Sequence, residues 1–321
     1  MTNAINQRTL KTYAYAKINL GLRVWRRRTD GYHDVTTILQ RISLCDLLAL
    51  TPRAKEVEYV GPELTSEPAD NLCIRAARAF QQCFGEEFGV RIELNKNIPI
   101  GAGLGGGSSD AAAVMRGMAR LYEAELPLIW GTNSDPRASE SLTEILLAAA
   151  AELGSDVPFF IHASMNRPKT NCSAAALAEG RGERLTPVKG LSPDLTIVII
   201  FPGYEISTAW AYQTVEEFLT FTEIDIILIN RNFLQYEGGI PFLEMGNDFE
   251  KPVFKTYPEL AEARQWLLQA GALFAGLSGS GSALYGVFDG EAAIRVQQLG
   301  LPAVDKRGAR QSWLSFVCRP F

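Results

Sequence analysis

Residues 99–109 read PIGAGLGGGSS, with five glycines among the nine positions from 101 to 109. Glycine reaches positive φ without strain and has no Cβ, so phosphate oxygens can approach its backbone N–H group closely. The stretch runs directly into a helix-forming segment, whose first amides and dipole favour negative charge. Two serine hydroxyls add groups that suit phosphate or its Mg²⁺. We therefore predict a phosphate-binding loop made of Pro99, Ile100, Gly101, Ala102, Gly103, Leu104, Gly105, Gly106, Gly107, Ser108 and Ser109.

Three other interpretations of the glycine stretch were weighed against this one. The P-loop pattern G-x-x-x-x-G-K fails, because Gly107 stands where its lysine is required. The dinucleotide pattern G-x-G-x-x-G is matched by Gly101, Gly103 and Gly106, with Glu123 at about the expected distance. That acid should end a second strand, whereas Glu123 ends a predicted helix. A tightly packed connection that needs glycine for steric reasons alone stays open.

Two charged residues could act on an acceptor hydroxyl. Asp156 follows a helix stop at Gly154 and precedes Val157-Pro158, which favours an extended backbone. By itself this local pattern fits an Asx turn better than a catalytic site. Lys17 shares one face of an alternating strand with Asn19, and the ordinary role of such a lysine is a solvated one. The residues alone therefore leave both roles open.

The periodicity around these residues predicts the elements that must position them. Residues 13–25 alternate as a half-buried strand, and 35–50 are apolar and β-branched, which indicates one or two more strands. A helix over 71–84 is opened by Asp70-Asn71, 90–94 is a strand, and a helix over 108–122 begins with a serine N-cap. Further along we expect a polar loop (131–140), a helix (141–153), an apolar segment (155–161), an irregular crossing (164–176), strands (194–203, 283–288, 314–318) and helices (207–219, 259–270).

The bulk composition favours a folded, globular protein. With 47% hydrophobic and 21% charged residues, 321 residues can bury a full core. The net charge of −5 disfavours a nucleic-acid partner, and no apolar run is long enough for a membrane helix. The first ten residues carry no signal pattern, so we expect a soluble, cytoplasmic protein. Two histidines provide no histidine-rich metal site, and an odd number of scattered cysteines indicates a reducing compartment: Cys45, Cys73, Cys83, Cys172 and Cys318.

PIGAGLGGGSS resembles the phosphate loop of the GHMP kinase superfamily. Further stretches make the chain similar to the 4-diphosphocytidyl-2-C-methyl-D-erythritol kinase family, over about residues 14 to 288. They occur in the expected order: AKINLGLRV, RRRTDGYHD, LGSDVPFF, AEGRGERL, FPGYEISTAWAY, NDFEKPVF and LSGSGSALYGVF. The chain departs from the pattern at Tyr15, where proline is common, and at Ala102, where glycine is frequent. Segments 131–140 and 164–176 are longer than usual.

The resemblance implies a two-domain α+β fold with the active site in the interdomain cleft. Residues 1–168 would form the ATP-binding domain and 169–321 the second domain, although the strand at 314–318 could return to the first. The implied reaction transfers the γ-phosphoryl of ATP, with Mg²⁺, to the 2-hydroxyl of a cytidine-diphosphate-linked methylerythritol. This is a step of the non-mevalonate route to isoprenoids, so the partner is a small molecule. The sequence indicates neither an oligomeric state nor protein ligands for the metal.

The resemblance also assigns roles to residues. It makes Asp156 the base or orienting group for the hydroxyl and Lys17 the cation that polarises it. Tyr32 and Tyr212 would sandwich the cytosine and His33 would bind its edge. Asn19 and Thr208 would bind the erythritol region, while Asn71 and Lys96 would lie on the adenine side. The second glycine–serine loop, residues 277–283, should pack against the first and close the phosphate site.

Two alternative functions remain at this stage. Another small-molecule kinase of the superfamily, of the homoserine or mevalonate type, would share the loop, but its substrate offers no base for Tyr32 and Tyr212 to stack on. A nucleotide-binding protein without catalysis is disfavoured because both Lys17 and Asp156 are present.

Overall fold

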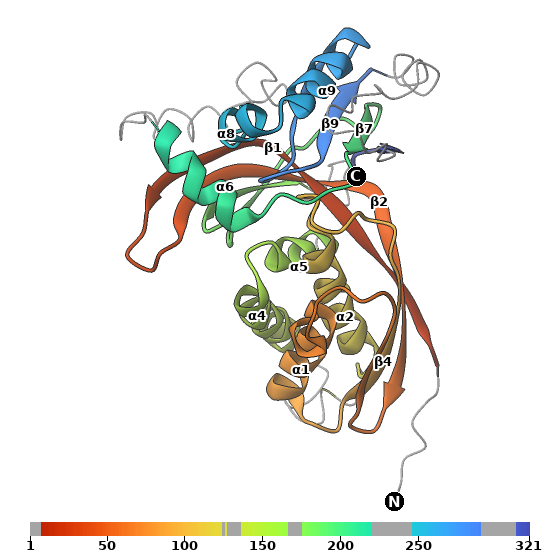
Figure 1. The fold of residues 1–321 in the computed structure, drawn as a ribbon. Helices are drawn as coiled ribbons and strands as arrows, with labels where there is room; N and C mark the ends of the chain where they lie inside the picture. Colours follow the sequence, from red (N-terminus) through yellow and green to blue (C-terminus); the bar gives the residue numbers. More distant parts are fainter. Residues whose placement is uncertain (1–7, 124–125, 127–135, 166–174, 220–245, 290–312) are drawn as a thin grey trace, which may run out of the picture. The chain divides into compact units, whose positions relative to one another are not determined.

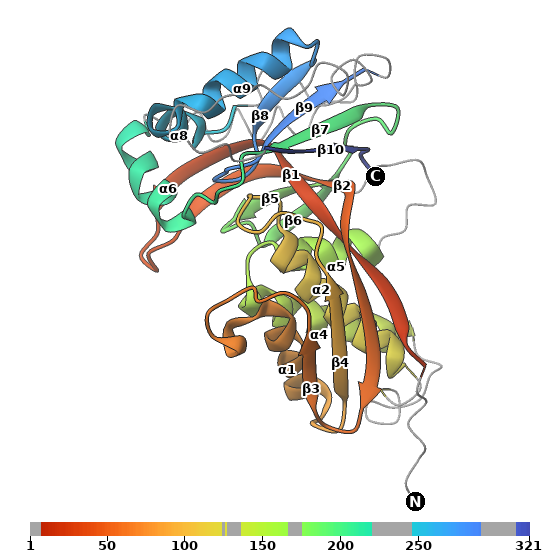
Figure 2. The same ribbon diagram turned by 45° about the vertical axis from the view of Figure 1, so that its right-hand side comes forward.

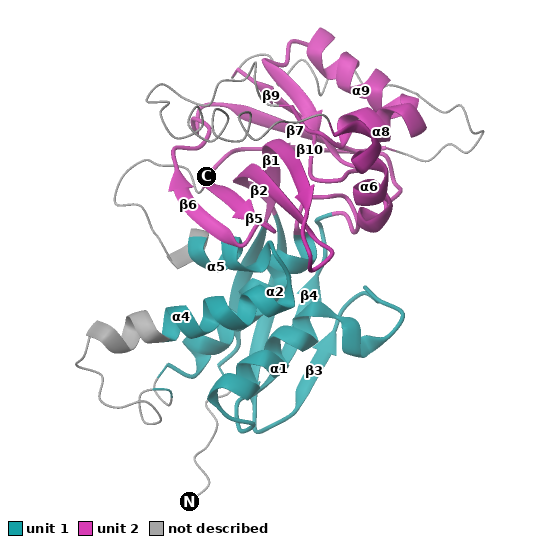
Figure 3. Ribbon diagram, turned by 90° about the vertical axis from the view of Figure 1, so that its left-hand side faces the viewer, with its two compact units in different colours: residues 1–15, 45–98, 106–167 teal, residues 16–44, 99–105, 168–321 magenta. Residues whose placement is uncertain are grey.

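The computed structural model describes residues 8–123, 126, 136–165, 175–219, 246–289 and 313–321. The chain forms two compact units, shown in Figure 3. Unit 1 consists of residues 1–15, 45–98 and 106–167, and unit 2 of residues 16–44, 99–105 and 168–321. The last division, after residue 167, lies one residue before the predicted domain boundary, whereas two segments assigned to the first domain, 16–44 and 99–105, belong to unit 2.

Two long strands form the first hairpin. β1 (Leu10–Arg27) is longer than predicted, and the predicted one or two strands over 35–50 are a single strand, β2 (His33–Arg53). Asp-Gly is a turn signal, and Asp30 and Gly31 make the turn between the two strands: Gly31 has a φ of 87°, and an Asp30 carboxylate oxygen accepts a hydrogen bond from Tyr32 N. Each strand supplies residues to both units, which explains why the units are not contiguous in sequence.

Unit 1 packs helices against a small sheet (Figure 2). The second half of β2 pairs antiparallel with β4 (Gly89–Asn95), and β3 (Val57–Val60) runs parallel to β4. Asn71, after a short 3₁₀ turn at Pro68–Asp70, caps α1 (Leu72–Phe84), whose apolar residues recur every three or four positions and are buried. The other helices of the unit are α2 (Gly106–Leu121), α4 (Pro136–Leu153) and α5 (Val157–Met165).

Three helix boundaries differ from the prediction. α2 begins at Gly106, so the expected serine N-cap is wrong and both serines lie in the first turn. α4 begins at Pro136, inside the predicted polar loop, because proline fits the first turn of a helix. Residues 131–135 of that loop lie outside the described part. α4 ends before Gly154, as predicted, and the apolar segment that follows is a helix, α5.

Unit 2 contains two groups of strands. The first half of β2 pairs with β5 (Ala175–Gly180), which pairs with β6 (Arg184–Val188). A second sheet has the order β10-β7-β9-β8, and α9 packs on β8 and β9 (Figure 2). Figure 1 shows α9 beside β9. These strands are β7 (Thr196–Phe201), β8 (Phe274–Leu277), β9 (Leu284–Phe288) and β10 (Leu314–Cys318); the helices are α6 (Thr208–Val215), a 3₁₀ turn (Glu216–Phe218), α8 (Glu250–Thr256) and α9 (Pro258–Gln269).

The sequence left open to which domain the strand at 314–318 belongs. β10 pairs antiparallel with β7, so it belongs to the second sheet of unit 2. The residues after it pair with β2: Ser43 N donates to Arg319 O (2.9 Å), and Phe321 N donates to Arg41 O (3.3 Å). Of the predicted crossing at 164–176, residues 166–174 lie outside the described part of the chain. Among the residues that the structure describes, no helix has both the length and the apolarity needed to cross a bilayer.

Candidate functional site

The glycine stretch takes the backbone conformation that its composition predicts. Gly101, Gly103 and Gly105 have positive φ values of 66°, 79° and 70°. A Cβ on Gly103 would lie 2.2 Å from Ser278 O, and one on Gly101 would lie 2.2 Å from a carboxylate oxygen of Glu205. Packing therefore requires glycine at these two positions, as the steric interpretation of the glycine stretch states. Packing does not explain Gly107, where a Cβ would meet only a side-chain carbon of Leu72 at 3.3 Å.

The second glycine–serine loop packs against the first, which confirms that part of the prediction. Ser278 Oγ donates to Gly103 O (3.0 Å), and Ala283 N donates to Ala102 O (3.0 Å). Asn247 in turn anchors the second loop, because its side-chain amide donates to Leu277 O and Gly279 O at 2.8 Å each. Sequence reasoning assigned no role to Asn247. The only sign of a role for Asn247 in the sequence is its place in NDFEKPVF, one of the stretches that carry the family resemblance.

Lys17 is 4% exposed, so the ordinary interpretation of a solvated lysine is wrong. Its Nζ donates to Gly103 O (3.0 Å) and to Asn19 Oδ1 (2.6 Å). Its backbone N donates to Leu104 O (3.0 Å), which ties β1 directly to the glycine stretch. Asn19 Nδ2 donates to Thr37 Oγ1 (3.0 Å). The strand face that was expected to be accessible is thus covered, and it holds a fixed ammonium group beside the loop.

We predict that Gly103→Ala destabilises the protein by about 2–4 kcal/mol, because it combines backbone strain with a clash against a carbonyl oxygen. The matched control is Gly31→Ala. Gly31 has a similar φ of +87° but no atom within 4 Å of its Cβ position, so only strain of about 1 kcal/mol is expected. Urea denaturation of both variants measures the difference. Equal losses of stability would show that the contact at Gly103 relaxes without cost.

The first turn of α2 lies beside the turn that carries Asp156, within unit 1. Ser108 Oγ is 4.0 Å from the position of a Cβ on Gly154. Ser109 Oγ, in contrast, donates to Tyr15 O (2.7 Å). The predicted extended backbone at Asp156 is wrong: residues 155–156 form a turn, Val157 N donates to Gly154 O (3.1 Å), and α5 begins at Val157. Asp156 therefore stands at the N-terminal end of α5.

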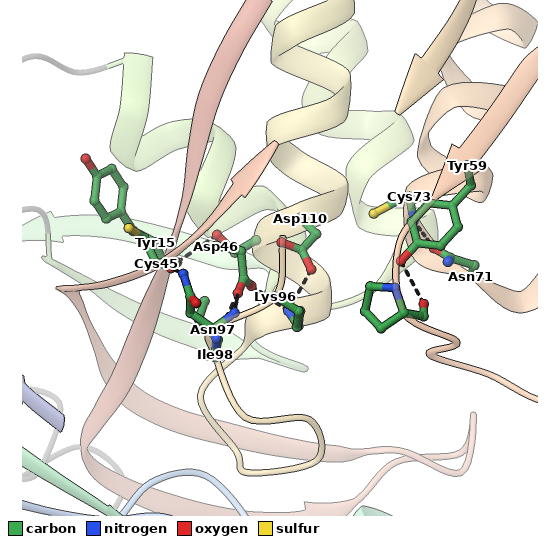
Figure 4. Close-up of polar contacts among 12 residues, drawn as sticks. Tyr15, Cys45, Asp46, Tyr59, Asn71, Cys73, Lys96, Asn97, Ile98 and Asp110 are labelled. Atoms are coloured by element: carbon green, nitrogen blue, oxygen red, sulfur yellow. Dashed lines mark hydrogen bonds and ion pairs between the residues drawn. The ribbon is translucent and has the colours of Figure 1, made fainter. Parts of the chain in front are cut away.

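The two predicted adenine-side residues also belong to unit 1, and Figure 4 shows them in separate polar groups. Asn71 Oδ1 accepts from Cys73 N (2.9 Å) as the cap of α1. Lys96 Nζ donates to Asp46 Oδ2 (2.5 Å) and to Asp110 Oδ2 (2.7 Å), and both carboxylates are fully buried. Sequence reasoning missed both partners. The only sequence signal for Asp46 is a single acid inside an apolar strand, and the only signal for Asp110 is an acid close to the start of the predicted helix over 108–122.

Burial dominates the electrostatics of this group. Burial, together with the charge of Asp46, raises the pKa of Asp110 to about 8, and Lys96 offsets only part of that shift. For Lys96, burial lowers the pKa, but the two carboxylates outweigh it, so its pKa is raised above the ordinary value of 10.5. Lys96 is therefore held as a cation, whereas burial shifts Asp110 toward its protonated form.

The raised pKa of Asp110 predicts a pH-dependent stability. Between the ordinary value of 3.8 and the folded value of about 8, the folded state binds the proton that the unfolded state has lost. Stability from this group is therefore full below pH 4 and is lost as the pH rises through 8, on the order of 1 kcal/mol per pH unit. Asp110→Asn removes this titration, so its stability relative to the unaltered protein should rise between pH 4 and 8 and level off above pH 8. Parallel denaturation curves across that range would contradict the assignment.

The residues predicted to bind cytosine lie in unit 2. The rings of His33 and Tyr212 stack, with centroids 5.2 Å apart and an interplanar angle of 24°. His33 Nε2 lies 3.0 Å from a carboxylate oxygen of Glu216. Tyr32 is 56% exposed, and the guanidinium of Arg181 lies 5.1 Å from its ring centroid. The structure therefore brings His33 and Tyr212 together and leaves one face of Tyr32 to an arginine.

Thr208 is the first residue of α6, so Thr208 and Tyr212 share a helix face as the sequence predicts. Thr208 Oγ1 lies 3.2 Å from Ser280 Oγ, which connects the helix to the second glycine–serine loop.

Comparison with known proteins gives the family. Profiles of the GHMP kinases match twice: the N terminal domain at residues 71–164 and the C terminal domain at residues 239–298. The chain is 39% identical to 4-diphosphocytidyl-2-C-methyl-D-erythritol kinase of Chlorobium luteolum, over 92% of this chain and 95% of that protein. It is 36% identical to the enzyme of the same name from Thermodesulfovibrio yellowstonii, over 86% and 88% of the two chains.

Solved structures agree with this result. A crystal structure of 4-(cytidine 5'-diphospho)-2C-methyl-D-erythritol kinase matches with a TM-score of 0.67 and 34% identity, over 97% of this chain and 99% of that chain. Homoserine kinase of Cytophaga hutchinsonii matches with a TM-score of 0.65 over 100% and 97% of the chains, but at 16% identity that match shows the fold alone. The chain therefore belongs to the 4-diphosphocytidyl-2-C-methyl-D-erythritol kinase family of the GHMP kinases.

Proposed function

We propose that this chain transfers the γ-phosphoryl group of ATP to the 2-hydroxyl of 4-diphosphocytidyl-2-C-methyl-D-erythritol. The observation that carries the proposal is the buried Lys17, whose ammonium group is bound to the carbonyl of Gly103 in the glycine stretch. Burying a charged lysine is costly unless it is hydrogen-bonded, and the bond from Lys17 to Gly103 O holds a positive charge at the loop, where a phosphoryl-transfer site needs one. The relatives named above carry this activity in their names.

ATP would bind along residues 99–109, in the first of the two proposed domains (1–168). The backbone of Gly101, Gly103 and Gly105, shaped by their positive φ values, and the N-terminus of α2 would present N–H groups that suit the phosphates. When bound, Mg²⁺ would neutralise charge on the triphosphate. The hydroxyl of Ser108 is better suited to hold the metal than that of Ser109, which already donates to Tyr15 O. Asn71 and Lys96 would face the adenine.

The chemical step needs a proton acceptor and a cation. The bond between the γ-phosphorus and its bridging oxygen breaks, and a bond to the 2-hydroxyl oxygen forms. The hydroxyl proton would pass to Asp156, and ADP would leave with the electron pair. Lys17 would polarise the hydroxyl. The position of Ser108 beside the 154–156 turn supports this role for Asp156, because both residues belong to unit 1.

The remaining polar and aromatic residues would select the acceptor. Tyr32 and Tyr212 would hold the cytosine ring, and His33 would bind its edge. Asn19 and Thr208 would contact the erythritol region. Three cysteines in the described residues, Cys45, Cys73 and Cys83, are free thiols, which supports a reducing, cytoplasmic location.

A coupled assay of ADP release tests the proposal with three alcohols. The expected result is turnover with 4-diphosphocytidyl-2-C-methyl-D-erythritol and none above background with homoserine or mevalonate. Mass spectrometry of the product should show one added phosphoryl group on the erythritol. Turnover with homoserine or mevalonate instead would assign the chain to another activity of the superfamily. No turnover with any acceptor, despite ATP binding, would favour a binding protein without catalysis.

A further inference from the structure

Asp46 is fully buried in β2 and uses both of its carboxylate oxygens. Oδ1 accepts hydrogen bonds from Asn97 N (2.6 Å) and Ile98 N (2.8 Å). Oδ2 accepts from Lys96 Nζ (2.5 Å). Three consecutive residues, 96 to 98, are thus bound to one carboxylate, as Figure 4 shows. They are the last residues before the glycine stretch begins at Pro99.

The same carboxylate holds Lys96 against the start of α2. Lys96 Nζ lies 2.9 Å from the position of a Cβ on Gly106, the first residue of that helix. Asp110, one turn further along α2, accepts a second N–H from the ammonium group (2.7 Å). Because two carboxylates fix the ammonium, its position at the helix N-terminus is set by β2 and α2 together.

We propose that Asp46 is a positioning residue for nucleotide binding, which sets the place of the Lys96 ammonium and of the backbone that leads into the glycine stretch. This inference rests on the proposed function, because it requires ATP to bind at Lys96. Asp46 acts in two separable ways, through Lys96 and through the N–H groups of Asn97 and Ile98. It touches no substrate.

The two ways can be separated by substitution. In Asp46→Asn the amide oxygen can still accept from Asn97 N and Ile98 N, but its NH₂ group offers Lys96 no acceptor. Asp46→Ala removes all three bonds. Lys96→Met removes the ammonium group and nearly preserves the shape of the side chain.

Steady-state kinetics at pH 7.5 with saturating acceptor give the test. Asp46→Asn and Lys96→Met should each raise KM for ATP about tenfold, with kcat within a few-fold. The first variant displaces the Lys96 ammonium group and the second removes it, so each loses the charge-assisted hydrogen bond between Lys96 and ATP. The double variant should show no larger KM than the worse single variant, since both changes remove one interaction. Adding Asp46→Ala to Lys96→Met should raise KM further, because the backbone bonds are also lost.

Val90→Ala is the matched control for lost stability, because Val90 is a buried apolar residue of β4 in the same unit. It should lower the melting temperature and leave KM for ATP unchanged. Should Asp46→Asn not fold, Asp46→Glu keeps the charge but displaces it, and the same rise in KM is expected. An unchanged KM in a folded Asp46 variant, or effects of Asp46→Asn and Lys96→Met that multiply, would overturn the inference. If the unaltered protein shows no saturable dependence on ATP, the proposed function fails instead.

Discussion

Replacing Asp156 by asparagine should lower kcat by about a hundredfold or more, the scale on which a general base contributes. The structure places Asp156 in the turn directly before α5, the position where a side-chain oxygen caps a helix. Asparagine caps a helix about as well as aspartate, so the helix should be unaffected. Asparagine cannot take the proton of the acceptor hydroxyl. The loss should therefore appear in kcat, measured by ADP release at saturating ATP and acceptor.

Two further measurements show whether a loss of kcat in Asp156→Asn comes from the chemical step or from unfolding. The melting temperature of Asp156→Asn should stay within a degree or two of the unaltered protein, which would exclude unfolding as the cause. Asp194→Asn is the matched control: Asp194 is an exposed carboxylate in a turn, with Ser192 as its side-chain partner, and its loss should leave kcat unchanged. Near-normal turnover in Asp156→Asn would reduce Asp156 to the Asx-turn role that its local sequence suggests.

The sequence predicted the local elements of the fold well, because their signals are local. The Asn71 cap, the end of α4 before Gly154 and the Asp30-Gly31 turn each follow from neighbouring residues, and the structure confirms them. The start of α2 was placed too late because the low helix propensity of glycine indicates a loop, whereas Gly106 and Gly107 lie in the first turn of the helix. The serines that looked like caps lie inside the helix.

The partners within the candidate site could not be predicted, because they are distant in sequence. Lys17 and Gly103 are 86 positions apart, and Asp46 and Lys96 are 50 apart. An alternating strand shows that Lys17 and Asn19 share a face, but periodicity does not reveal what covers that face. The same limit applies to Asp46. The sequence shows only an acid in an apolar strand, and it does not show that the backbone N–H groups of residues 97 and 98 bind this carboxylate.

Lys17→Ala should also lower kcat by about a hundredfold or more, because it removes the cation proposed to polarise the hydroxyl. A structural role would give a different result. The Lys17 ammonium binds Gly103 O and Asn19 Oδ1, so its loss leaves two acceptors without their charged donor and could loosen the glycine stretch. Rate alone does not separate these two effects, and a second variant is needed.

Lys17→Met supplies that variant, because methionine fills most of the space of the lysine stem, whereas alanine leaves a cavity beside the two acceptors. Both variants should lose kcat. Ethylammonium or propylammonium added to the assay should restore part of the activity of Lys17→Ala, since the amine can enter the cavity and bind Gly103 O and Asn19 Oδ1. It should not rescue Lys17→Met, where the cavity is filled. Near-normal kcat in Lys17→Met would contradict a catalytic role for Lys17, since that variant retains the packing and lacks only the charge.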